Sequence, residues 1–553
     1  MARRGYPVGT SVRRYKGVGV RRPALVASCS AALVLLLTAS SSVAASAITS
    51  SATTQAPTTS SSTSASSASS TTTTLLKPNK TATENLLTYH YGNARQGFDS
   101  LDPSFRHLTR AWTTSGSKIA GDIYAEPLVE GKTVFVVTEA DDVYALSANT
   151  GAVEWRVNVG NPAQSSSVQA APGLGGCGDI YPIGITGTPV IDPSSGVLYL
   201  AAEVQKTGAT WTGVEHVMVA IRLNDHKILW SREIDPAHAG NGNGGTYIIA
   251  AEQQRAALSL DRGRVYAEFG GLSGDCSAYH GYVVSLPESG KPPLGVYQTP
   301  SPREDAIWAT SGAAVNESGD LYVATGNGSD SDKTFKMDNA VIELSPSLKV
   351  ISDYAPLDWS VMNDQDLDLG SGGPTLLPGE SLLFEAGKAS YPSGDGGSRE
   401  SLGYLLNPKS LGGVGHPLFR GQVCPNAGYV FGANAVAVVK VKGVSTTVIF
   451  VPCPSGTVAL AVKKGAHPSF TRIWEASAGN PNGPPILAGG LIWAISTGSD
   501  GGGGGNDLYG MDPSTGKVLV TESLAQVDHF VTPAAGDGEI FVGTTDGVEA
   551  FRP

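Results

Sequence analysis

The chain has 553 residues, of which 41% are hydrophobic and only 16% charged, and it contains 69 glycines. This composition supplies a sizeable core, and low charge with abundant glycine favours short strands and turns over surface helices. The net charge of the whole chain is -11, but residues 1–47 hold seven basic side chains and no acid. The remainder of the chain therefore carries a net charge of -18, since -11 minus 7 is -18. An acidic body repels phosphate backbones and anionic lipid, which excludes nucleic-acid binding and peripheral membrane binding.

The first 47 residues have the pattern of an export signal. A basic region ends at Arg21-Arg22, the apolar run PALVASCSAALVLLLTA follows, and the sequence ASA at 45–47 provides a small-residue cleavage site. We predict a signal peptide over 1–47. An uncleaved membrane anchor is the alternative, because roughly 17 apolar residues approach the lower length limit of a membrane span. Such an anchor is the only membrane contact that the sequence predicts.

A low-complexity stretch follows the signal. Twenty of the 27 residues in 48–74 are Ser or Thr and none is charged. A segment with so little apolar surface cannot offset the entropy cost of ordering. We therefore predict a disordered stalk over 48–86 and one folded domain over 87–553. A signal followed by such a stalk indicates an extracytoplasmic protein, either secreted or held at the cell surface.

The folded part repeats one short unit. The first copy reads AEPLVEG, TVFVVTEA, DVYALSANTG and AVEWRVNVG over 125–160, and each piece has the alternation or short apolar run of a strand. Gly151 supplies the positive φ that a tight hairpin turn requires. The unit is therefore predicted to be a four-stranded antiparallel meander.

Its second strand recurs along the chain, giving eight copies in all: VFVVTEA, VLYLAAEV, RVYAEFGG, LYVATGNG, LLFEAGK, VIFVPCP, LIWAISTG and IFVGTTDG. Four-stranded repeats of roughly 40 to 50 residues are typical of β-propellers. A β-helix needs shorter coils, and a sandwich rarely contains eight like units. Trp155 and Trp230, at fourth-strand positions, are predicted to pack between blades.

The two ends of the repeat array are complementary. The last copy stops at GVEAFRP and lacks a fourth strand, whereas LTRAWTTSG at 108–116 resembles a fourth strand without a preceding unit. We therefore predict an all-β, eight-bladed propeller of four-stranded antiparallel blades. Residues 108–116 complete the last blade, which removes an exposed sheet edge.

Four cysteines remain beyond the signal, an even number that suggests two disulfides in an oxidising compartment. Cys424 and Cys453 lie in consecutive strand-and-turn units and form the favoured pair, and Cys177 with Cys276 follows by elimination. A zinc site is the rival interpretation, but the chain has no Cys-x-x-Cys spacing.

The repeat core YALSANTGAVEWRVNVG, the opening segment YHYGNARQGFDSLDP and the segment LYVATGNGS resemble the PQQ-binding-like β-propeller repeat family, which has the quinoprotein alcohol dehydrogenase-like fold. The resemblance covers about 88–553 and implies a bacterial protein. The family contains dehydrogenases that hold pyrroloquinoline quinone (PQQ) with calcium in the central funnel. It also contains a non-enzymatic scaffold for outer-membrane assembly, so the resemblance is specific for fold and less so for chemistry.

In the family's enzymes the quinone is bound by residues near the starts of the innermost strands. Matching positions here, the candidate cofactor-binding residues, are Glu126, Arg255, Trp308, Asp368 and His529, together with Lys388, which resembles a lysine that contacts the quinone. A structural or solvated funnel wall is the alternative interpretation of all six. The adjacent-cysteine disulfide of alcohol-oxidising members and the Cys-x-x-Cys-His haem site are both absent from the sequence.

One acidic loop is a candidate metal site. In DQDLDLG, the alternating residues Asp364, Asp366 and Asp368 are spaced like the start of an EF-hand. However, Gly370 comes one position late, and Thr375 stands where the EF-hand requires Glu. A turn that leads into a strand explains the spacing equally well.

Together these observations predict an exported propeller that binds an unknown protein or small-molecule ligand and catalyses no reaction. It would need no cofactor. The first alternative is a PQQ-dependent dehydrogenase of alcohols or sugars, with PQQ and calcium in the funnel. A carbohydrate- or wall-binding module on a stalk is the second.

Overall fold

The structure is a computed structural model that describes residues 85–102, 104–236, 248–329, 334–391, 398–476, 478–497 and 506–553. The predicted signal peptide at 1–47 and all but the last two residues of the predicted stalk lie outside the described residues. In the described part, no helix has both the length and the apolar character needed to cross a membrane.

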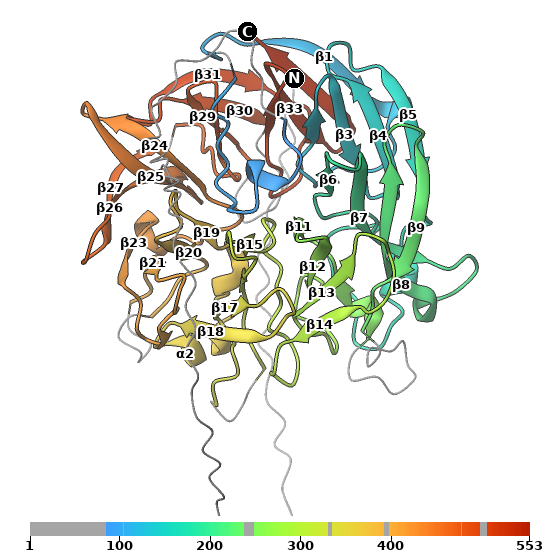
Figure 1. Cartoon of the computed structure of the whole chain (residues 1–553), viewed down its shortest axis with the longest axis horizontal. Coiled ribbons are helices and arrows are strands. Elements are labelled where there is room, and N and C mark those ends of the chain that lie inside the picture. Colours follow the sequence, from blue (N-terminus) through green and yellow to red (C-terminus); the bar gives the residue numbers. More distant parts are fainter. Residues whose placement is uncertain are drawn as a thin grey trace, which may run out of the picture. The chain divides into compact units, whose positions relative to one another are not determined.

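The described residues form eight sheets, which confirms the predicted eight-bladed propeller. Six sheets have the predicted four antiparallel strands; the third and fourth along the chain have a fifth strand, and in the fourth the added strand pairs parallel with its neighbour. In Figure 1 the sequence colours pass around the ring of blades from cyan through green and yellow to red. We number the blades 1 to 8 in chain order. In each blade the first strand is innermost and the following strands lie progressively further out.

The first four blades are built as follows. Blade 1 has β2 (Leu128–Glu130), β3 (Thr133–Val137), β4 (Asp142–Ser147) and β5 (Val153–Asn158); blade 2 has β6 (Val190–Asp192), β7 (Val197–Gln205), β8 (Val214–Arg222) and β9 (Lys227–Glu233). Blade 3 has β10 (Glu252–Gln253), β11 (Ser259–Asp261), β12 (Arg264–Gly271), β13 (Tyr282–Pro287) and β14 (Gly295–Gln298); blade 4 has β15 (Ala314–Val315), β16 (Leu321–Ala324), β17 (Val341–Leu344), β18 (Val350–Ala355) and β22 (Gly413–Val414).

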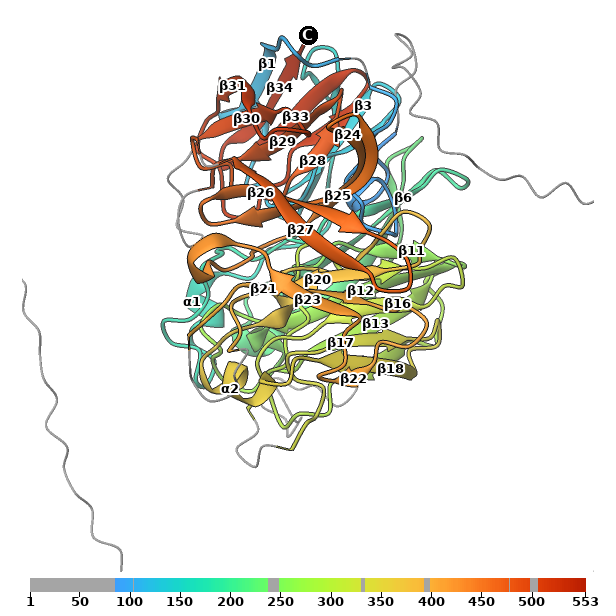
Figure 2. The same cartoon turned by 90° about the vertical axis from the view of Figure 1, so that its left-hand side faces the viewer.

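The second half of the ring follows the same plan. Blade 5 has β19 (Thr375–Leu376), β20 (Leu383–Ala386), β21 (Leu402–Leu406) and β23 (Phe419–Gln422); blade 6 has β24 (Ala435–Val441), β25 (Val444–Cys453), β26 (Gly456–Lys463) and β27 (Ser469–Ala476). Blade 7 has β28 (Ile486–Ala488), β29 (Leu491–Ile495), β30 (Asp507–Met511) and β31 (Val518–Ser523); blade 8 has β32 (Ala534–Gly536), β33 (Glu539–Thr544), β34 (Gly547–Arg552) and β1 (Thr109–Ser115). Two short helices, α1 (Ser165–Val168) and α2 (Trp359–Asp364), lie on the same side of the ring in Figure 2.

The ring closes through the N-terminal strand, as predicted. Strand β1 pairs antiparallel with β34, from Thr109 opposite Arg552 to Ser115 opposite Gly547. The last blade thereby gains its outer strand from the other end of the folded domain. Joining the two ends in one sheet covers an edge that would otherwise expose unpaired backbone groups.

An axial segment, residues 86–99, precedes β1 and appears in blue inside the ring in Figure 1. Hydrogen bonds join it to the innermost strand of every blade, in turn at Val129, Ile191, Leu260, Val315, Leu376, Val436, Leu487 and Ala535. Its Arg95 is fully buried and donates to the carbonyl oxygens of Ala313 and Leu258 at 3.0 and 3.1 Å and to the hydroxyl of Ser259 at 2.6 Å. The opening segment therefore closes the centre of the ring.

A group of buried acids lies where blades 1 and 2 meet. Glu139 follows β3, Asp141 lies two residues further on, and Glu203 belongs to β7; all three are almost completely buried. Burial, with neighbouring carboxylates acting in the same direction, raises the pKa of Glu139 to about 8 and that of Asp141 to about 9. His216 sits between Asp235, at 2.8 Å, and Glu203, at 3.4 Å.

These groups predict that stability falls as the pH rises from about 5 to 9. The unfolded carboxyls lose their protons near pH 4, whereas the folded Glu139 and Asp141 keep theirs to about pH 8 and 9, so the unfolded state gains relative stability in between. Burial disfavours the charged form of His216, but the carboxylates of Asp235 and Glu203 outweigh burial and raise its pKa to about 10. His216 therefore also makes the folded state less stable as the pH rises. Urea unfolding at pH 5, 7 and 9 should show a falling midpoint. The variant Asp141→Asn should flatten that fall, and an unchanged slope would contradict the assignment.

Candidate functional site

A cavity of about 270 Å³ opens at the end of the ring axis where the innermost strands begin. Its wall is formed by the loops that precede these strands and by the ends of the second strands. Neighbouring strands of an antiparallel blade run in opposite directions, so the start of the first strand and the end of the second lie at the same edge. Below it a void of about 10 Å³ separates Arg255 and His529 from Tyr89 of the axial segment, which leaves the mouth cavity closed at its base.

Five of the six predicted cofactor-binding residues line this mouth cavity: Arg255, Trp308, Asp368, Lys388 and His529. Sequence position explains their convergence. Arg255, Trp308, Asp368 and His529 lie four to seven residues before β11, β15, β19 and β32, a length that reaches the mouth. Lys388 follows β20, the second strand of blade 5.

Glu126 does not line the mouth cavity. It lies only two residues before β2, deeper along the axis, and its carboxylate accepts a 2.8 Å hydrogen bond from the backbone N–H of His90. Burial raises its pKa well above the usual range, although the His90 N–H and the charge of Arg95 oppose this. The structure thus places Glu126 against the axial segment, away from the other five residues.

Lys388 is held between two aspartates. Its Nζ lies 2.7 Å from Asp366 Oδ1 and 2.9 Å from Asp368 Oδ2. Burial alone lowers the pKa of Lys388, but the charges of Asp368 and Asp366 outweigh it and raise that pKa above its usual value. The second oxygen of Asp368, Oδ1, accepts a 2.7 Å hydrogen bond from the backbone N–H of Asn327. Both oxygens of this buried carboxylate are therefore engaged.

Aromatic rings form the opposite wall. The Trp308 ring lies 6.3 Å from Phe431 and 6.3 Å from Phe530, between ring centroids. The Arg255 guanidinium lies over Phe530 at 4.3 Å and over Trp308 at 5.6 Å, within the range of cation–π attraction. Its Nη2 is buried without a hydrogen-bond partner in the described part of the chain, so it is a donor available to a ligand.

His529 adds a ring that stays neutral near pH 7. Burial lowers the pKa of His529 to about 4, and the charge of Arg255 acts in the same direction. Asp179 opposes this shift from 3.5 Å away, between its Oδ2 and His529 Nε2. At neutral pH the cationic groups of the wall are thus Arg255 and Lys388.

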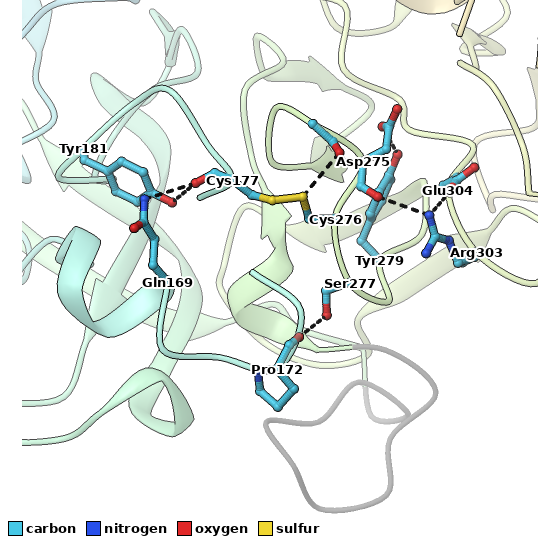
Figure 3. Close-up of a disulfide and its surroundings, with 11 residues drawn as sticks. Gln169, Pro172, Cys177, Tyr181, Asp275, Cys276, Ser277, Tyr279, Arg303 and Glu304 are labelled. Atoms are coloured by element: carbon cyan, nitrogen blue, oxygen red, sulfur yellow. Dashed lines mark hydrogen bonds and ion pairs between the residues drawn. A yellow bond between two sulfur atoms is a disulfide. The ribbon is translucent and has the colours of Figure 1, made fainter. Parts of the chain in front are cut away.

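The sequence reasoning missed two aspartates of this wall, Asp179 and Asp275. Both lie beside the disulfide between Cys177 and Cys276, which is drawn in Figure 3. Asp275 accepts a 2.6 Å hydrogen bond from Tyr279. The signal that could have identified them was their position next to predicted disulfide cysteines.

Both predicted disulfides are confirmed, and they have different positions. Cys424 pairs with Cys453, and both residues are completely buried in the core of blades 5 and 6. The Cys177–Cys276 bond instead joins the loop between blades 1 and 2 to the loop that follows β12 (Figure 3). Of the two disulfides, Cys177–Cys276 is the one that borders the mouth cavity.

The predicted metal-binding aspartates do not come together around one point. Asp364 ends α2, while Asp366 and Asp368 turn to Lys388, whose ammonium group takes the place between them. Across the ranges that the structure describes, no three His, Cys, Asp or Glu side chains are gathered in a way that could hold a metal ion.

The wall is also a poor match for PQQ bound with calcium. PQQ carries several carboxylates, whereas the wall itself presents four, from Asp179, Asp275, Asp366 and Asp368. Only Arg255 and Lys388 oppose them, and Lys388 is already paired. Calcium requires six to eight oxygen ligands, and the donors described above do not assemble such a set. The residues that line this cavity therefore do not fit PQQ bound with calcium.

Solved structures with a similar fold include two quinohemoprotein alcohol dehydrogenases and a methanol dehydrogenase. The chain resembles the quinohemoprotein alcohol dehydrogenase ADHIIG of Pseudomonas putida HK5 (TM-score 0.56, 13% identity, covering 85% of this chain and 80% of that one). It also resembles a europium-containing methanol dehydrogenase (0.56, 15%, 85% and 98%) and the quinohemoprotein alcohol dehydrogenase of Comamonas testosteroni (0.55, 14%, 84% and 80%). At these identities the likeness concerns the fold alone.

Comparison of the sequence itself points to the same repeats. A family model described as "Outer membrane protein assembly factor BamB" matches residues 109–268. No curated protein sequence matches the chain significantly. The matched segment covers β1 and the first two blades and extends into the third, and its four-strand unit recurs through the ring. Over residues 109–268 the chain is therefore similar to this family of PQQ-like repeats, and its fold is the β-propeller of the solved structures named above.

Proposed function

We propose that this protein is an extracytoplasmic binding propeller that captures a small polar ligand in the mouth cavity and catalyses no reaction on it. The observation that carries this proposal is that both carboxylate oxygens of Asp368 already have partners. A general base needs a carboxylate that is available to take a proton. Both Asp368 oxygens are instead occupied, one by Lys388 and the other by the Asn327 N–H.

The remaining wall suits recognition. Aromatic rings on one side provide a flat apolar surface, and Arg255 Nη2 offers a hydrogen-bond donor beside it. Carboxylates and the Asn327 side chain on the other side provide acceptors and a donor. Small-molecule sites commonly combine a mainly apolar cavity with a few such polar groups. A molecule with one flat face and several hydroxyl or amide groups matches both walls.

Two disulfides support a place outside the cytoplasm. All four cysteines beyond the predicted signal are paired, and disulfides persist in oxidising compartments. The predicted signal peptide and stalk agree with export. We propose a secreted or cell-surface bacterial protein.

The family model's description, an outer-membrane assembly factor, supports a scaffold role in which a bound protein is held by the same propeller.

Replacing Lys388 with methionine should lower the free energy of unfolding by about 2–3 kcal/mol, because a buried carboxylate loses its cation. Asp366 is largely exposed, which keeps the loss below that of a fully buried pair. Urea unfolding measures the change. Lys440→Met, which removes an exposed lysine, is the matched control and should cost less than about 1 kcal/mol. Equal losses would show that Asp368 does not depend on Lys388.

The binding function is tested by a thermal-shift screen of the purified protein with sugars, amino acids, amides and polyols. Compounds that raise the melting temperature are then titrated calorimetrically against the wild type and the Trp308→Ala variant. A compound whose affinity for Trp308→Ala is at least about tenfold weaker than for the wild type supports the mouth cavity as the binding site. Hits that bind both proteins equally, or a screen without hits, would contradict the proposal.

The alternative is a PQQ-dependent dehydrogenase of alcohols or sugars, favoured by the convergence of five predicted residues on one cavity. It requires that the purified protein, incubated with PQQ and calcium chloride, retain quinone absorbance after desalting and reduce an electron-accepting dye with an alcohol. We expect neither result. Retained absorbance with dye reduction would replace the binding proposal by the enzymatic one.

A further inference from the structure

Tryptophans of the outer strands follow a rule where two blades meet. At three junctions the indole packs on a positive-φ glycine in the next blade's outer hairpin, as in Trp112 on Gly151, Trp230 on Gly290 and Trp474 on Gly516. In each case the indole Nε1 donates to a carbonyl of the same hairpin, at 2.6, 3.0 and 3.1 Å. The predicted packing role of Trp230 is thus confirmed, and the glycine is what allows the indole to come so close.

The junction between blades 1 and 2 departs from this rule. Trp155 occupies the tryptophan position, but the hairpin of blade 2 reads LNDHK and places His226 at the positive φ of 59°. The indole stacks on the imidazole at 4.8 Å with an interplanar angle of 23°. Within the described ranges, Trp155 Nε1 has no hydrogen-bond acceptor. A side chain in place of glycine therefore holds this junction apart.

A rim groove of about 530 Å³ lies at this junction. Its aromatic surface comes from Trp155, from His226 and from Phe135, whose ring centroid is 5.9 Å from the indole. Glu130 and Glu154 add two carboxylates, and no lysine or arginine of the described residues lines the groove. Within the part of the chain that the structure describes, neither carboxylate forms an ion pair, and burial raises the pKa of Glu130. An aromatic surface with two uncompensated acids attracts an organic cation.

The groove adjoins a free sheet edge. Strand β5, which carries Glu154 and Trp155, is the outermost strand of blade 1, and no described strand pairs with its outer side. The corresponding strand of blade 4, β18, already accepts an added strand, β22, with Tyr354 opposite Gly413. An outer edge of this propeller can therefore pair with an extended segment, which is a common mode of peptide recognition.

We propose that the rim groove binds an arginine side chain of a partner polypeptide, whose extended backbone pairs with the outer edge of β5. The planar guanidinium stacks on the Trp155 indole and forms ion pairs with Glu130 and Glu154. Arginine fits better than lysine, because its flat, forked cation both stacks and bonds in two directions. This site is separate from the mouth cavity, and the proposal does not depend on a ligand there.

The test measures binding of a fluorescein-labelled probe peptide, GTVRVTG, to the purified protein by fluorescence anisotropy. A second probe carries citrulline, the neutral isostere of arginine, at the same position. The arginine probe should bind at least about tenfold more tightly, because only it has the charge. Its affinity should fall by a similar factor in Glu130→Gln/Glu154→Gln. The double variant Glu317→Gln/Glu475→Gln, with the same change of net charge at exposed sites, should bind like the wild type.

The sharpest variant is His226→Gly, which restores the glycine of the other three junctions. It should close the groove and abolish binding without lowering the free energy of unfolding, since glycine adopts a positive φ freely. Equal binding of the two probes, binding that survives His226→Gly, or no binding of the arginine probe would each overturn the proposal. Self-association of the protein that disappears in His226→Gly would also overturn it, by assigning the groove to a second copy of the chain.

Discussion

Replacing Arg95 with methionine should lower the free energy of unfolding by about 4 kcal/mol. The guanidinium is fully buried in the axial segment and donates to Ala313, Leu258 and Ser259, as well as to Thr88 Oγ1 at 3.0 Å. Methionine keeps much of the volume but provides no donor. Several buried acceptors would then lack partners, and each costs about 1–3 kcal/mol, less what local relaxation or water recovers.

The effect should extend around the ring, because the axial segment bonds to the innermost strand of all eight blades. Guanidinium chloride unfolding followed by tryptophan fluorescence measures it. Arg95→Lys keeps a positive charge without the forked donors and should fall between the wild type and Arg95→Met. Arg232→Met, at an exposed arginine, should cost less than about 1 kcal/mol. A similar loss at both arginines would show that the axial segment contributes little to closure.

Removal of the Cys177–Cys276 disulfide should loosen the mouth cavity. The bond closes a loop of 99 residues, and the chain-entropy treatment assigns such a loop about 4–5 kcal/mol as an upper value. Asp179 and Asp275 flank the bond and line the cavity, so the variant Cys177→Ser/Cys276→Ser frees two parts of the wall at once. Hydrogen exchange in the loops 177–181 and 271–277 should become at least about tenfold faster.

The Cys424–Cys453 disulfide provides the control. Cys424→Ala/Cys453→Ala opens a loop of 29 residues, worth about 3–4 kcal/mol in the same treatment, in the core of blades 5 and 6. It should lower global stability without a selective effect on exchange at the mouth. Mouth loops that respond equally to both variants would contradict a specific role for Cys177–Cys276.

The architecture was accessible from the sequence because it is repetitive. Each copy of the unit has the same strand periodicity and the same turn, so eight weak signals reinforce one another. The missing fourth strand of the last copy and the unaccompanied strand at 108–116 together predicted the closure that β1 and β34 form. The order of the units also favoured the Cys424–Cys453 pair, and Cys177–Cys276 followed by elimination.

The candidate site was accessible only in part. Position relative to the innermost strands grouped Arg255, Trp308, Asp368, Lys388 and His529, and these five residues line one cavity. The same reasoning placed Glu126 with them, although its shorter distance from β2 puts it against His90. Depth along the axis depends on loop length and loop path, which repeat periodicity does not encode.

The amino-acid sequence by itself determined the blade, the number of blades and the way the ring closes, because these depend on local periodicity and chain order. The tertiary structure alone decided which charges meet. Lys388 lies between Asp366 and Asp368, Arg95 bonds across the axis, and Trp155 meets His226 instead of a glycine. Such contacts join residues far apart in the chain through loops of irregular path, so the chemistry of the site appears only when the ring is assembled.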